Sequence, residues 1–284
     1  MRVLITGGGG QLARELLRAL AEHEVVAPTR RELDVTNEAR VRQAVSGVHP
    51  DLVIHTAALT DTTRCEREPL RAQQVNAIGT LNVVSAACEV GARFVYISTN
   101  EVFDGTKRTP YEESDSPNPI NAYGYSKLCG ERAVTERCAR FYVVRTAWLY
   151  GDGDRHFPAK LLRAAAASED LRVVDDEVAT PTWCRDLARA VVRLVLTEAP
   201  SGVYHLTNAG EASRFAWASR LFELTGARVR LTPVSSREYH DGSDGPRKPA
   251  YSVLANTAAA RAGIVLRDWR EAFDEFAASW TRHG

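Results

Sequence analysis

The sequence predicts an α/β protein with a Rossmann-like, doubly wound parallel sheet and a smaller C-terminal lobe. Three observations support this fold class. Short runs rich in Val and Ile alternate with helical patterns through the first half, which is typical of a parallel sheet covered on both faces. A glycine-rich turn, Gly7–Gly10, separates the first such run from a helix. The regular alternation changes after about Tyr150, which indicates a second lobe.

The first half contains five expected strands, each short and mostly apolar. They are Arg2–Thr6, Glu24–Pro28, Asp51–His55, Arg93–Ser98 and Phe141–Thr146. Four helices are expected between them, and their starts are marked by cap candidates or by proline. They are Gln11–Ala21, Asn37–Val45, Pro69–Val90 and the helix that carries Tyr123 and Lys127.

The sequence of the second half predicts mainly helices, together with two strands and a long polar loop. The expected helices are Phe157–Ser168, Cys184–Thr197, Ser213–Thr225, Asn256–Ala262 and Trp269–Arg282. The strands are Leu171–Val174 and Gly202–Leu206, and the loop is Ser235–Pro249. We expect residues 151–284 to form mainly a substrate-binding lobe, in which segments near 184–206 return to the first domain.

Charge and cysteine content narrow the functional class. Acidic and basic residues balance at 36 each, which argues against nucleic-acid or membrane-surface binding. No apolar run approaches the roughly 20 residues that span a bilayer, and no signal peptide is recognisable. Five scattered cysteines without a C-x-x-C pair favour the reducing cytoplasm over a disulfide framework, and we expect no metal site.

The glycine turn predicts a dinucleotide site. Gly7 and Gly10 allow the backbone to approach a pyrophosphate, and the helix that opens at Gln11 and Leu12 supplies free N–H groups. Ala13 stands where the fingerprint has its third glycine. We therefore interpret residues 1–150 as an NAD(P)-binding Rossmann domain.

The cofactor preference is read from the end of the second strand. An acidic residue there would favour NAD, but the chain has Arg30 and Arg31, which suit the 2′-phosphate of NADPH. The alternative is a pair of solvated arginines, and NADH stays open as cofactor. Asp34 and Val35 are the expected contacts to the adenine edge, although Asp34 also suits a helix cap.

Two further segments follow strands of the predicted sheet. Ala57, Ala58 and Leu59 are small or apolar and let backbone lie against the cofactor, unless they form a plain tight turn. Thr99 ends the next strand, where ligands bind in such sheets. Its hydroxyl is placed to bond a substrate carbonyl; the alternative is a bond to backbone.

Tyr123 and Lys127 carry the expected chemistry. Residues four apart on a helix lie on one face, and an ammonium there lowers the pKa of a phenol, normally about 10. The pair then acts as a general acid and base. The alternative is an exposed lysine beside a core tyrosine. The chain has only four lysines, so a lysine at this position is not a default surface charge.

Together these residues resemble the extended short-chain dehydrogenase/reductase superfamily, and within it the dTDP-4-dehydrorhamnose reductases. The resemblance runs nearly end to end. It rests on Gly7–Leu12, Asn76–Thr80, Ser98–Gly105, Tyr123–Glu131, Arg145–Gly151 and Pro181–Ala188.

The resemblance implies a function. Thr99, Tyr123 and Lys127 would be catalytic, NAD(P)H would donate hydride, and the substrate would be a nucleotide-linked 4-keto-6-deoxyhexose. Trp148 would line the sugar-nucleotide pocket. A homodimer is compatible with this interpretation.

Departures from the family pattern concern the sugar. Asn100 and Glu101 replace the usual Asp-Tyr and are expected to border the substrate. Asp61–Thr63 and Lys248–Ala255 depart as well. Glu101 also occurs in sugar-nucleotide 4,6-dehydratases, so a dehydratase or epimerase is one alternative. A non-catalytic NADP-binding subunit resembling the methionine adenosyltransferase β subunit is the other.

Overall fold

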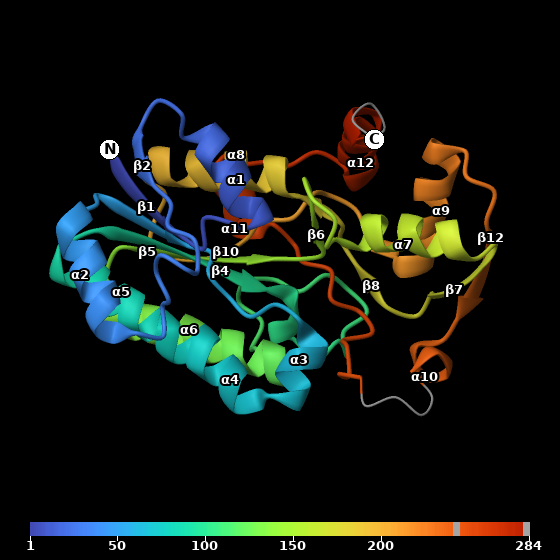
Figure 1. Ribbon diagram of the computed structural model, residues 1–284, viewed down its shortest axis with the longest axis horizontal. Coiled ribbons are helices and arrows are strands. Elements are labelled where there is room, and N and C mark those ends of the chain that lie inside the picture. The colour runs from blue at the N-terminus through green and yellow to red at the C-terminus, as the bar shows by residue number, and fades with distance from the viewer. Residues whose placement is uncertain (241–244, 281–284) are drawn as a thin grey trace.

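The structure, a computed structural model, describes residues 1–240 and 245–280. Its centre is a six-stranded parallel sheet in the order β10–β5–β4–β3–β1–β2 (Figure 1). The chain runs outward from β1 to β2 and then crosses β1 to reach β3. This reversal makes the carboxyl ends of β1 and β3 a switch point, where ligands bind in open α/β sheets. The predicted fold class is confirmed.

Helices cover both faces of this sheet (Figure 1). The strands are β1 Arg2–Thr6, β2 Glu24–Val26, β3 Leu52–His55, β4 Arg93–Thr99, β5 Phe141–Thr146 and β10 Gly202–His205. One face carries α1 Gln11–Ala19, α8 Cys184–Leu196 and α11 Thr257–Arg261, and the other carries α2 Glu38–Val48, α5 Gly79–Glu89 and α6 Ala122–Arg137.

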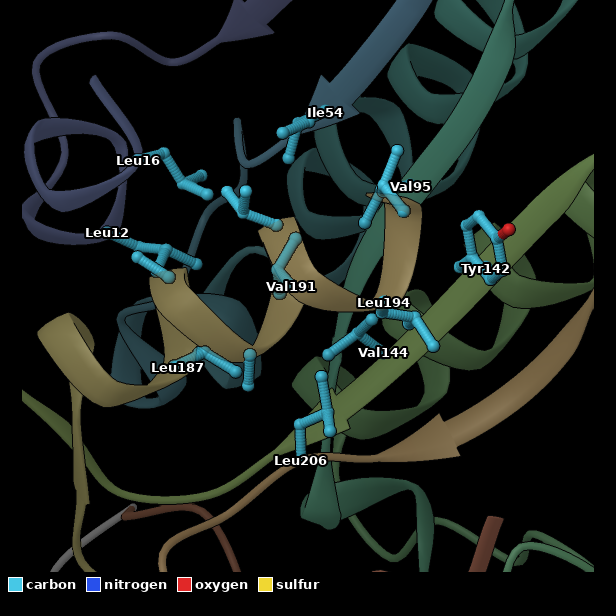
Figure 2. Close-up of a cluster of buried hydrophobic side chains, with 14 of the residues drawn as sticks. Leu12, Leu16, Ile54, Val95, Tyr142, Val144, Leu187, Val191, Leu194 and Leu206 are labelled. Atoms are coloured by element: carbon cyan, nitrogen blue, oxygen red, sulfur yellow. The ribbon is translucent and has the colours of Figure 1, made fainter. Parts of the chain in front are cut away.

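The core between the sheet and α1 and α8 is built from leucine and valine side chains (Figure 2). Leu12 and Leu16 are one helical turn apart and point the same way, as do Leu187 and Val191. These side chains pack against sheet residues such as Val95. Residues of the second half therefore complete the main domain: β10 pairs with β5 at one edge of the sheet, and α8 covers one of its faces.

The remaining part of the second half surrounds an aromatic core. Its members include Tyr150, Trp183, Trp217, Trp269 and Phe273. The helices that contribute to it are α7 Phe157–Ala167, α9 Arg214–Thr225 and α12 Trp269–Trp280, whereas α10 Ser236–Tyr239 has no buried residue. Three small strand pairs complete it: β7 Asp170–Val174 with β12 Arg230–Val234, β8 Val178–Ala179 with β11 Ala212–Ser213, and β6 Leu149–Tyr150 with β9 Thr182–Trp183.

Several elements differ from the sequence-based expectation. The helix expected over Pro69–Val90 is divided into α4 Pro69–Gln73, a π-helical turn Gln74–Ile78 and α5, and α3 Thr62–Arg67 precedes it. A 3₁₀ turn, Asn100–Val102, follows β4. Helix α10 lies inside the expected loop Ser235–Pro249, of which residues 241–244 are outside the described residues, as is Arg282.

Three smaller points bear on the site. Asn37 caps α2 by accepting a backbone N–H, so the alternative interpretation of Asp34 as that cap is wrong. The five cysteines are all free. In the two described ranges, no helix has both the length and the apolar character that crossing a membrane requires.

Candidate active site

The glycine turn joins β1 to α1 at the switch point of the sheet. Gly7 has a φ of 75°, and a Cβ there would lie 2.9 Å from the backbone of Ala57. Gly10 caps α1 without a side-chain hydrogen bond, so the first N–H groups of the helix are available to an anion. Leu12 is buried beneath the turn, whereas Oε1 of Gln11 is buried without a partner among the described residues. These features fit the pyrophosphate region of a dinucleotide.

The expected adenosine contacts lie along the loop after β2. Arg30 and Arg31 are exposed there. Oδ1 of Asp34 accepts hydrogen bonds from the backbone N–H of Thr36 at 3.0 Å and from its hydroxyl at 2.8 Å. These bonds, the backbone one foremost, lower the pKa of the Asp34 carboxyl. Val35 is buried beside it. Asp34 and Val35 are therefore held in the loop, and among the described residues neither Arg30 nor Arg31 has a hydrogen-bond or ion-pair partner, so both can meet a phosphate.

A residue outside the predicted site connects the loop after β3 to α6, the helix that carries Tyr123 and Lys127. Oδ1 of Asn76, in the π-helical turn, accepts the N–H of Leu59 at 2.7 Å. Its Nδ2 donates to the Leu59 carbonyl at 3.0 Å and to the Ser126 hydroxyl at 2.9 Å. Ser126 in turn donates to the carbonyl of Tyr123 at 2.8 Å. One buried amide thus fixes the segment that begins at Ala57 and Ala58 relative to α6.

The expected catalytic residues come from two elements that pack against each other. Thr99 ends β4, and Tyr123 and Lys127 lie one turn apart on α6. Gly124 makes this packing tight, because a Cβ at that position would lie 2.0 Å from the carbonyl oxygen of Glu101. The close approach brings the Tyr123 phenol within hydrogen-bonding reach of the Thr99 hydroxyl. This hydroxyl also accepts the backbone N–H of Glu101 at 3.1 Å, so the alternative of a bond to backbone is met as well.

The protonation of this group differs in part from the sequence-based expectation. Burial raises the pKa of the Tyr123 phenol, the charge of Glu101 raises it further, and the hydrogen bond with Thr99 opposes both. The ammonium of Lys127 lies 4.1 Å from the centre of the Tyr96 ring, and burial lowers the pKa of Lys127 to about 7. Lys127 is not among the groups that shift the pKa of Tyr123, so the expectation that Lys127 lowers this pKa is not met.

Glu101 is held from two sides. Its Oε1 lies 3.0 Å from Nζ of Lys248, and its Oε2 accepts a hydrogen bond from Nδ2 of Asn121 at 2.8 Å. The neighbouring Asn100 donates to the Ser252 hydroxyl at 2.7 Å. Lys248 and Ser252 belong to a segment that the sequence marks only as a departure from the family pattern. The structure brings both against the turn after β4.

Trp148, just after β5, contacts an arginine of α9. Its φ is 42°, a conformation that is rare for a bulky residue and is found where the surroundings enforce it. Its indole stacks on Trp217 with ring centres 6.0 Å apart, and Cζ of Arg214 lies 3.6 Å from its ring centre. Arg214 faces Glu177 at 4.0 Å and lies within electrostatic reach of Glu101.

Known proteins share this arrangement of elements and motifs. A family model described as the RmlD substrate binding domain matches residues 1–282. The chain belongs to this family. A dTDP-4-dehydrorhamnose reductase of Mycolicibacterium smegmatis is 42% identical over 284 residues, which cover 98% of this chain and 85% of that protein. A dTDP-4-keto-6-deoxy-D-glucose reductase of Streptomyces niveus is 40% identical over 280 residues, 96% of each chain.

Solved RmlD-type structures have the same fold. The dTDP-4-dehydrorhamnose reductase of Bacillus anthracis, in complex with NADP, matches with a TM-score of 0.93 and 36% identity, over 98% of this chain and 99% of that one. The resemblance that the motifs indicated is thereby confirmed over the whole chain.

Proposed function

We propose that the protein uses NADPH to reduce the 4-keto group of a nucleotide-linked 4-keto-6-deoxyhexose. The observation that carries this proposal is the meeting of Thr99, Tyr123 and Lys127 at the edge of the sheet where the glycine turn also lies. Relatives at 40–42% identity that are named as reductases of dTDP-4-keto sugars support the substrate class. The similar structure solved with NADP supports the cofactor.

The side chains have distinct roles in this reaction. The bound cofactor supplies a hydride for C4 of the sugar. Tyr123 donates its proton to the oxygen on which negative charge develops, and the Thr99 hydroxyl hydrogen-bonds the same oxygen. The raised pKa of Tyr123 keeps the phenol protonated, as a proton donor requires. Lys127 binds the ribose hydroxyls next to the nicotinamide.

The cofactor residues follow the order of the chain. Four of them, in the glycine turn and at the start of α1, hold the pyrophosphate: Gly7, Gly10, Gln11 and Leu12. Ala57, Ala58 and Leu59 lie along the cofactor, Asp34 and Val35 border the adenine, and Arg30 and Arg31 bind the 2′-phosphate. NADH is the alternative donor if those arginines contribute little.

The environment of Glu101 disfavours the dehydratase or epimerase alternative. A base that removes a ring proton needs a free carboxylate, but Glu101 is paired with Lys248 and bonded by Asn121. The neighbouring Asn100 is an amide and has no carboxylic proton to donate. Asn100, Glu101 and Trp148 border the sugar in this proposal rather than perform elimination.

We also propose a domain organisation, a cellular location and an oligomeric state for the protein. Residues 1–150 form the cofactor domain and residues 151–284 mainly the sugar-binding lobe, with residues near 184–206 completing the first domain. Free cysteines support a cytoplasmic protein. A homodimer is part of the proposal, which size measurement in solution tests.

Turnover separates the three candidate functions. We expect NADPH to be consumed with dTDP-linked 4-keto-6-deoxyhexoses, and no water to be lost from dTDP-glucose by the wild type or by Asn100→Asp. NADPH binding without turnover of any keto sugar would favour the regulatory subunit. A product lighter by one water would establish the dehydratase.

A further inference from the structure

Four charged side chains from four separate segments gather beside the candidate catalytic residues. They are Glu101, Glu177, Arg214 and Lys248. Their side chains are only 8–22% exposed. Charges removed from water to this extent are costly unless ion pairs and hydrogen bonds replace the lost solvent. The four side chains differ in how many ion pairs and hydrogen bonds they have in place of solvent.

Glu101 has hydrogen-bond partners, whereas Glu177 and Arg214 have only electrostatic neighbours among the described residues. Glu101 has Lys248 at 3.0 Å and the amide of Asn121 at 2.8 Å. The nearest N···O distance between Arg214 and Glu177 is 4.0 Å, which is too long for a hydrogen bond. Within residues 1–240 and 245–280 no hydrogen bond reaches either side chain. A guanidinium with five donors therefore faces a carboxylate whose acceptors are open.

Packing fixes this open pair in place. Cζ of Arg214 lies over the Trp148 indole, 3.6 Å from the ring centre, and the Trp148 backbone has a φ of 42°. Burial raises the pKa of Glu177 and lowers that of Arg214 to about 10. The charge of Arg214 partly lowers the pKa of Glu177 again, and the charge of Glu177 partly raises that of Arg214. Lys248 and His240 also act on Glu177 as opposite charges, and Glu101 acts so on Arg214, so what both groups lack among the described residues is a hydrogen-bond partner.

The net charge of the four side chains indicates which chemical group of a ligand would supply the missing hydrogen-bond partners of Arg214 and Glu177. Glu101 acts electrostatically on Tyr123 and also on Arg214 and Glu177, so the pair belongs to the surroundings of the reacting sugar. Two carboxylates and two cations sum to zero, which gives a phosphate little advantage. A hydroxyl group both donates and accepts and adds no charge, so it satisfies a guanidinium and a carboxylate together.

We propose that Arg214 and Glu177 bind ring hydroxyls of the hexose and select sugars that retain them over deoxygenated ones. This inference rests on the proposed function and adds the specificity-determining residues to it. Arg214 donates to a hydroxyl oxygen and Glu177 accepts a hydroxyl hydrogen. A sugar without these hydroxyls leaves both groups buried and unpaired, which lowers affinity by about tenfold to a hundredfold.

Binding measurements test the inference without requiring turnover. Calorimetry with dTDP and with dTDP-L-rhamnose, on the full chain with NADP⁺ present, gives the gain in affinity due to the hexose. We expect Arg214→Met and Glu177→Gln each to reduce this gain about tenfold or more, while the affinity for dTDP alone is retained. Arg172→Met, which removes an exposed guanidinium paired with Glu238 in the same lobe, is the matched control and should keep the gain.

The outcomes separate this inference from the proposed function. An unchanged hexose contribution in either variant would overturn the inference, and so would an equal loss for dTDP alone, because Arg214 would then hold the nucleotide. Melting temperatures with NADP⁺ verify that each variant is folded. A wild type that binds dTDP-L-rhamnose as expected but reduces no keto sugar would overturn the proposed function and leave the inference standing.

Discussion

The hydroxyl of Tyr123 is the single atom group on which turnover should depend most. Tyr123→Phe removes the proton donor, so we expect kcat to fall by about 10² or more. NADPH affinity should change little. Steady-state kinetics and a cofactor titration measure both. Tyr125→Phe is the matched control, since Tyr125 lies on the same helix and is 53% exposed. An inactive Tyr125→Phe beside an active Tyr123→Phe would contradict the assignment.

Arg30 and Arg31 should determine the choice between the two nicotinamide cofactors. Replacing both with alanine removes charge-assisted hydrogen bonds to a phosphate that only NADPH carries. We expect the dissociation constant of NADPH to rise about tenfold while that of NADH changes little. Fluorescence titration with each cofactor measures the two constants. Equal losses for both would remove the basis for the NADPH preference.

Lys127 should make the stability of the cofactor-free protein depend on pH. Its pKa is about 7 in the folded chain against an ordinary value of 10.5, so the unfolded chain binds more protons between these values. The free energy of unfolding contributed by this group therefore rises with pH across that window, and the full penalty remains below pH 7. Lys127→Met abolishes the dependence.

Melting curves at pH 7 and near pH 10 test this statement. The melting temperature of the wild type, relative to that of Lys127→Met, should be lower at pH 7 and should recover as the pH rises. A difference that stays constant or changes in the opposite direction would show that Lys127 is not buried as an ammonium of lowered pKa.

Among the elements, the π-helical turn has the clearest consequence for the site. Asn76→Ala leaves the N–H of Leu59 without its partner, which costs about 1–3 kcal/mol, while the Leu59 carbonyl keeps only the weak donor Sγ of Cys65 at 3.5 Å. We expect a lower free energy of unfolding in denaturant together with weaker NADPH binding. Asn82→Ala, which removes one bond to the Val35 carbonyl from the same helical region, should have the smaller effect on both. Equal effects would contradict the linking role of Asn76.

The elements that sequence patterns predicted are those with strong local signals. Strands such as Arg2–Thr6 are continuous apolar runs buried on both faces, and helices such as Gln11–Ala19 repeat leucine every turn. The short strands of the second half depend on their partners: β12 contains a proline and exposed residues and exists by pairing with β7. The π-helical turn inside Pro69–Val90 has the same sequence pattern as the α-helix around it, so no residue type in it predicts the change of helix type.

The same distinction applies to the site. Thr99, Tyr123 and Lys127 were predictable because their spacing and their position after a strand and on a helix are local features. Lys248 lies 147 residues from Glu101, and Arg214 is one arginine among many. Only the three-dimensional structure brings such residues together, because no short-range pattern records their contact.

For the molecule as a whole, α8 should be essential although it comes from the second half of the chain. Leu187 is fully buried between α8, α1 and the sheet, so Leu187→Ala should lower the free energy of unfolding by about 2–5 kcal/mol. Leu196, at the end of the same helix, is 54% exposed, and Leu196→Ala should change it by less than about 0.5 kcal/mol. Denaturant unfolding measures both. Similar values for the two variants would contradict the described packing.

The central claim, that hydride passes to C4 of a nucleotide-linked keto sugar, has one direct test. The protein is incubated with NADPH that carries deuterium at both C4 positions of the nicotinamide and with a dTDP-4-keto-6-deoxyhexose, and the sugar product is examined by mass spectrometry and NMR. We expect a product with one deuterium bound to C4, formed by the wild type and at least about 10² times more slowly by Tyr123→Phe. A sugar recovered without deuterium at C4, or one that has lost water, would contradict this claim.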